Sequence, residues 1–172
     1  MAQQQSSTPN AAQRLIDGAS LNQILGVTPA QEQSLAVIGF NFYRQGKMNE
    51  AETVFKGLTA LDEHSYYGYA GLGAVALAKR PPDLKTAYEN LSKAVALNPN
   101  DPSVQANLGE TLLRAGKLED AKGPLEKAFQ LDPGHNDAGA NRARALVGGL
   151  NTIVQQVESR LQEQAKAGSK SN

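Results

Sequence analysis

The feature that most constrains the fold is a pattern of small and apolar residues that recurs along residues 32–135. Each copy contains a glycine, then an alanine, then a large apolar residue four positions after the alanine. The three copies are Gly39, Ala51 and Phe55; Gly73, Ala87 and Leu91; and Gly109, Ala121 and Leu125. Glycine and alanine are twelve residues apart in the first and third copies and fourteen apart in the second. The extra two residues fall in Arg80-Pro81-Pro82-Asp83, where prolines end one helix and delay the next.

These three units of 34 residues, with one two-residue insertion, resemble the tetratricopeptide repeat. In that repeat the small residues let two antiparallel helices approach closely, and the larger apolar residues fill the space between them. The predicted fold is therefore all-α, with three tandem helical hairpins that form an α-solenoid. The predicted repeats are 32–65, 66–101 and 102–135. Unrelated helical hairpins are the alternative, but three units in consecutive register argue against it.

Two helical segments are predicted to flank the repeats. Residues 11–31 form an N-terminal helical region with a weak point at Asp17-Gly18, and residues 136–165 form a C-terminal helix. The apolar residues of the C-terminal helix recur about every 3.5 positions, which suits a helix that caps the stack. The polar segments 1–10 and 166–172 are predicted to be disordered. The N-terminal region carries five apolar residues that are candidates for dimerisation: Leu15, Ile16, Leu21, Ile24 and Leu25.

Composition excludes several classes of function. Seventeen Lys and Arg balance seventeen Asp and Glu, so no basic excess is present to bind nucleic acid. The chain has no cysteine and no catalytic or metal-binding motif, and His64 and His135 both lie in predicted turns. No segment is long and apolar enough to insert into a membrane, and the first ten residues show no secretory signal. We therefore expect no enzyme, no cofactor and no metal site.

A repeat stack has a concave surface that is lined by the first helix of each repeat. At the inward positions the first two repeats are apolar and partly aromatic, which suits the side chains of an extended peptide. In the third repeat, an amide and a carboxylate could bind the peptide backbone. The candidate binding residues are Phe40, Tyr43, Arg44, Tyr67, Ala70, Ala74, Leu77, Asn107 and Glu110. In the alternative interpretation, the N-terminal helical region covers Phe40 and Leu77, which are then core residues.

Specific segments also resemble the class II chaperones of bacterial type III secretion. The segment 40–47, FNFYRQGK, followed by Glu50-Ala51 and Val54-Phe55, is similar to a conserved stretch of that family. Leu61-Asp62 and the segment 69–74, YAGLGA, are similar to a second stretch. The resemblance covers roughly residues 15–150 and is most specific between residues 40 and 74.

The resemblance implies a cytoplasmic, non-enzymatic chaperone that keeps hydrophobic translocator proteins soluble before export. It implies that an extended translocator segment binds in the concave groove, against Phe40, Tyr43, Tyr67, Ala70, Ala74 and Leu77. It also implies a homodimer of the free chaperone, formed through the N-terminal helix. The second and third repeats are nearer the general tetratricopeptide consensus than this family usually is. A general scaffold that joins the parts of another complex is therefore the alternative function.

Overall fold

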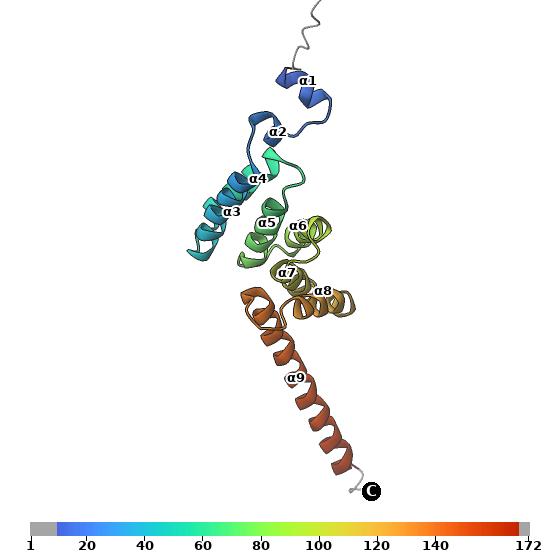
Figure 1. The fold of residues 1–172 in the computed structure, drawn as a ribbon. Helices are drawn as coiled ribbons and strands as arrows, with labels where there is room; N and C mark the ends of the chain where they lie inside the picture. The colour runs from blue at the N-terminus through green and yellow to red at the C-terminus, as the bar shows by residue number, and fades with distance from the viewer. Residues whose placement is uncertain (1–9, 169–172) are drawn as a thin grey trace, which may run out of the picture. The chain divides into compact units, whose positions relative to one another are not determined.

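The computed structural model describes residues 10–168, and side chains as far as residue 162; the two predicted disordered ends lie largely outside this range. The described chain is entirely helical, which confirms the all-α prediction (Figure 1). It divides into two compact units, of which one ends at Pro99 and the other begins at Asn100. The helices are α1 (Ala11–Ile16), α2 (Leu21–Leu25), α3 (Pro29–Arg44), α4 (Met48–Leu61), α5 (Tyr66–Ala78), α6 (Leu84–Leu97), α7 (Pro102–Arg114), α8 (Leu118–Leu131) and α9 (Ala138–Gly168).

Three helical hairpins form the repeats, as predicted: α3 packs on α4, α5 on α6, and α7 on α8. The first hairpin begins at Pro29, three residues before the predicted start of its repeat. Thr28 explains the earlier start, because its side chain accepts a hydrogen bond from the Gln31 amide while the Gln31 side chain accepts one from the Thr28 amide. Between the second pair, α5 ends before the two prolines and the Asp83 side chain caps α6.

The repeated glycines lie where the two helices of each hairpin cross. A Cβ atom at Gly39 would lie 2.7 Å from the Phe55 ring, and one at Gly73 or Gly109 would lie 2.5 Å from Cγ of Leu91 or Leu125. The alanines at the second repeated position, Ala51, Ala87 and Ala121, are completely buried. The recurring residues are therefore the contact residues of the hairpins, as the sequence indicated.

The N-terminal region is divided into two short helices. Gly18 has a left-handed backbone (φ 88°) between them, at the predicted weak point. Ser20 then caps α2 by accepting a hydrogen bond from the Gln23 amide. Of the described helices, α1 contacts only α2, and α2 also contacts α4. The N-terminal region thus packs against the second helix of the first repeat.

The C-terminal helix differs from the prediction in two respects. It continues to Gly168, so residues 166–168 are helical rather than disordered, because Ala165, Lys166 and Ala167 are good helix formers. Only its first turns cap the stack: Ala140 and Ala143 are completely buried, and every residue from 148 to 162 is exposed. The 3.5-residue period predicts a capping face along the whole helix, but most of that face contacts neither α7 nor α8 (Figure 1).

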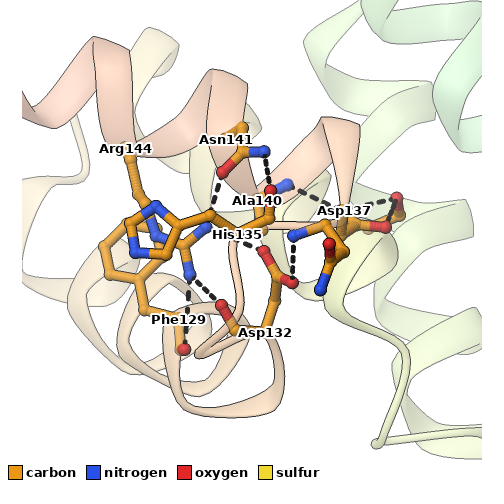
Figure 2. A network of polar contacts seen from close by, with 9 residues as sticks. Phe129, Asp132, His135, Asp137, Ala140, Asn141 and Arg144 are labelled. Atoms are coloured by element: carbon orange, nitrogen blue, oxygen red, sulfur yellow. Dashed lines mark hydrogen bonds and ion pairs between the residues drawn. The ribbon is translucent and has the colours of Figure 1, made fainter.

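A network around Arg144 anchors the first turns of α9. The Arg144 guanidinium donates a hydrogen bond to the buried Asp132 carboxylate (2.8 Å) and lies 5.1 Å from the centre of the Phe129 ring (Figure 2). This hydrogen bond from Arg144 lowers the pKa of the Asp132 carboxyl. Asp137 caps the helix by accepting from the Ala140 amide (2.7 Å) and also accepts from the Ser103 hydroxyl. The network holds α9 against both α7 and the end of α8.

Candidate partner-binding surface

Three aromatic side chains of the candidate site lie on neighbouring helices of the first unit. Phe40 and Tyr43 belong to α3, and Tyr67 belongs to α5, which contacts α3. All three are half-buried and pack against a core cluster that consists of Ala36, Ala51, Phe55, Leu58 and Val75. The Phe40 and Phe55 rings meet edge to face, with centroids 4.9 Å apart. The core thus supports these rings from one side, and the other side is open to solvent; we call Phe40, Tyr43 and Tyr67 the aromatic face.

The small residues predicted beside them contribute little accessible surface. Ala70, Ala74 and Leu77 are all buried in α5. They belong to a helix that is buried on several faces, as its alanine and glycine content indicates. Arg44 ends α3, is exposed, and donates a hydrogen bond to the Asn41 side chain. A partner on this surface would therefore meet mainly the aromatic face.

The structure bears on the alternative in which the N-terminal helices cover this surface. Among the described helices neither α1 nor α2 contacts α3 or α5. Phe40 and Leu77 are therefore not covered by the N-terminal region. The burial of Phe40 comes in part from its own repeat, through Phe55.

The two polar candidates lie in the second unit and already have partners. Glu110 is buried in α7, and its carboxylate lies 2.7 Å from both Arg114 and Arg142. The Asn107 side-chain oxygen accepts a hydrogen bond from the same Arg142. Because Arg142 belongs to α9, the two residues fasten that helix to α7. A peptide backbone that bound to them would first have to displace Arg142.

The apolar residues predicted to mediate dimerisation are largely exposed. Leu15, Ile16, Leu21 and Leu25 are between 41% and 78% exposed, and Ile24 is half-buried. Leu15 and Leu21 line a cleft of about 630 Å³ between the α1–α2 turn and the end of α4. Leu35 and Ile38 add exposed apolar surface on α3. No described helix covers α3 on this side, because the N-terminal helices pack on α4.

Comparison with known proteins finds similarity to chaperones and to a tetratricopeptide repeat. The tetratricopeptide-repeat family pattern matches residues 83–123. The low calcium response locus protein H of Yersinia pestis is 34% identical over 113 residues, which are 66% of this chain and 64% of that protein. The chaperone protein SicA of Salmonella typhimurium is 28% identical over 131 residues, which are 76% of each chain.

Two solved structures share the fold. A type III secretion complex from Aeromonas hydrophila superposes with a TM-score of 0.65 and 27% identity over 86% of this chain and 99% of that one. PcrH in complex with the chaperone binding region of PopB superposes with a TM-score of 0.56 and 27% identity, over 70% of this chain and 97% of that one. The chain is a tetratricopeptide-repeat relative of the translocator chaperones of type III secretion.

One exposed residue of this translocator-chaperone relative was not among the candidates. Val37 lies on α3 one turn before Phe40 and is 51% exposed. The repeat register predicts this exposure. Val37 occupies the sixth position of its repeat, and in tetratricopeptide repeats the side chain at that position of the first helix is expected on the concave side. It extends the aromatic face along α3.

Other kinds of site receive no support from the part of the chain that the structure describes. In residues 10–162 no three His, Cys, Asp or Glu side chains are grouped so that they could hold a metal ion. None of the described helices has the length and the apolar character needed to cross a membrane.

Proposed function

We propose that this chain is a non-enzymatic cytoplasmic chaperone for a translocator protein of type III secretion. It holds an extended apolar segment of the translocator against its concave face and keeps the translocator soluble and unassembled before export. The observation that carries the proposal is the aromatic face together with Val37. This surface is apolar, is supported by a packed core, and is not covered by any described part of the N-terminal region.

The chemistry of this surface suits an extended peptide. Half-buried aromatic rings that the core holds in place bind apolar side chains without losing much conformational freedom. The tyrosine hydroxyls of Tyr43 and Tyr67 can remain in water while their rings contact a ligand. The similarity to PcrH supports the same conclusion, because PcrH is found in complex with the chaperone binding region of PopB.

We further propose that the free chaperone is a homodimer formed through the N-terminal helices. Leu15, Ile16, Leu21 and Leu25 leave apolar side chains exposed there, and Leu35 and Ile38 of α3 are further exposed apolar residues. Exposed apolar side chains that lie close together are typical of an interface between proteins. Replacement of both Ile16 and Leu25 by glutamate should abolish association through the N-terminal helices and leave the helical content unchanged.

The test is co-expression with proteins that contain long apolar segments and are encoded beside this gene. Size-exclusion chromatography with light scattering should find a soluble stoichiometric complex with a protein that precipitates when expressed alone. Val37→Glu places a charge on the binding surface without disturbing the core and should abolish the complex. Tyr67→Ala should weaken it. Leu118→Glu is the matched control, because Leu118 is 59% exposed and belongs to α8 of the other compact unit, which carries no residue of the aromatic face.

Each outcome distinguishes the proposal from the scaffold alternative. If Val37→Glu and Tyr67→Ala bind the translocator as the control does, and circular dichroism shows them folded, the aromatic face is not the binding site. If the chaperone elutes unchanged while every candidate translocator aggregates, the chain is a scaffold that binds a folded partner.

A further inference from the structure

The exposed part of α9 carries a regular apolar stripe that the proposed function does not use. Val147, Leu150, Val154, Val157 and Leu161 are separated by three, four, three and four residues. This alternation places them at successive a and d positions of a heptad repeat, with Val147, Val154 and Leu161 at a and with Leu150 and Val157 at d. The last four are between 39% and 59% exposed, and we call all five the α9 seam.

The surroundings of the seam show that Val147 is half-buried and that nothing within the second unit covers the other four seam residues. The first turns of α9 are fastened to α7 and α8, whereas every residue from 148 to 162 is exposed on all sides of the helix. Gly148 and Gly149 have no atom within 4 Å of the position of a Cβ atom. Two adjacent glycines weaken a helix that stands alone, so this segment gains stability from a partner helix.

The charge pattern favours a second copy of the same helix as that partner. Between Arg144 and Glu158 there is no charged residue at all. In a parallel, in-register pair of identical helices each seam residue faces its own copy, so any charge there would be opposed by a like charge. A seam that lacks charge removes this obstacle, and it offers nothing to attract a strongly acidic or basic partner.

The residue types also fit a two-stranded pair. Among parallel coiled coils, β-branched residues at a positions with leucine at d positions favour two strands over three or four. Val147 and Val154 occupy a positions, and Leu150 lies at the d position between them. Ile153, at a flanking g position, would widen the contact and is itself 59% exposed.

We propose that α9 pairs with α9 of a second copy of this chain in a parallel two-stranded coiled coil along the α9 seam. This interface is separate from the N-terminal surface and does not depend on the binding of a translocator. Because the seam spans little more than two heptads, the pair is weak and forms at high micromolar concentration. Where both interfaces form, the chain assembles beyond a dimer.

Disulfide crosslinking tests the proposal on the full chain, which has no cysteine of its own. In a parallel pair, identical a positions face each other within the distance that a disulfide spans. Val154→Cys should therefore form crosslinked dimers at least about tenfold faster than Ser159→Cys, which lies at an f position on the other side of the helix. Both variants should also carry the Ile16→Glu and Leu25→Glu changes, so that the N-terminal surface does not contribute.

Equal crosslinking rates for the two cysteines would overturn the proposal, because they would reflect random collision. Crosslinking of Val154→Cys with Val157→Cys, but of neither with itself, would overturn the parallel arrangement. Sedimentation equilibrium gives an independent measurement on the same background. Val154→Glu should weaken association by about 100-fold, because both copies lose a seam side chain, whereas Ser159→Glu should leave it unchanged. A chain that remains monomeric at high concentration would also overturn the proposal.

Discussion

Replacement of Gly71 by alanine should destabilise the first unit, although alanine is the better helix former. A Cβ atom at Gly71 would lie 2.2 Å from Cδ1 of Phe55, whereas carbon atoms in contact are about 3.5–4.0 Å apart. The ring would therefore have to retreat by about 1.3 Å or more. Phe55 is completely buried. Its ring cannot move toward α3, because the backbone of Gly39 lies against it: a Cβ atom at Gly39 would be 2.7 Å from the same ring.

The magnitude follows from two opposing contributions. Overpacking of a core costs about 1–3 kcal/mol, and the confinement of Phe55 places this case in the upper part of that range. Replacement of a helical glycine by alanine contributes about 0.5–1 kcal/mol of stability. We expect a net loss of about 1–2 kcal/mol for Gly71→Ala.

Gly57→Ala is the matched control, because Gly57 lies in the neighbouring helix α4 with no atom within 4 Å of the position of its Cβ. It should gain about 0.5–1 kcal/mol. Urea unfolding followed by circular dichroism at the helical band measures both variants against the parent chain. If Gly71→Ala unfolds at the same urea concentration as Gly57→Ala, or at a higher one, the inference that Gly71 packs closely against Phe55 is wrong.

Three further predictions concern the second unit. Arg144→Met should lower the melting temperature by several degrees, because it leaves the buried Asp132 carboxylate without its cation, and an unchanged melting temperature would contradict the anchoring role. The pKa of the Asp132 carboxyl is lowered in the folded chain. The contribution of this carboxylate to stability is therefore complete above its ordinary pKa of 3.8 and is lost as the pH falls through the lowered pKa. The melting temperature below pH 4 should consequently depend less on pH in Asp132→Asn than in the parent chain. Glu110→Gln should speed hydrogen exchange in the first turns of α9, because Arg142 loses its charged partner; exchange at the parent rate would show that the ion pair does not hold the helix.

Much of the fold could be predicted because its repeats are defined by contacts between residues a fixed number of positions apart. Glycine at one position and phenylalanine or leucine sixteen or eighteen positions later are found in contact in all three hairpins. The two-residue insertion could be placed because proline ends helices for local steric reasons. The helix boundaries near Thr28 and Gly18 also have local causes, namely a capping box and a left-handed turn.

The candidate site was predictable in part. The aromatic positions on α3 and α5 follow from the repeat register, and the structure leaves them half-buried over the core. The roles of Asn107 and Glu110 could not be anticipated, because their partner Arg142 lies more than thirty residues away in a segment outside the repeats. The spacing of residues indicates which face of a helix is polar, but it does not indicate which cationic side chain forms an ion pair with that face.

The three hairpins follow from the order of amino acids alone, since each repeat encodes its own internal contact. The way in which the flanking helices use their apolar faces is visible only in the folded chain. The N-terminal helices pack on α4 and leave the aromatic face uncovered, and α9 buries only its first turns. The physical reason is that periodicity specifies an apolar face, whereas the surface that covers it depends on packing between distant segments.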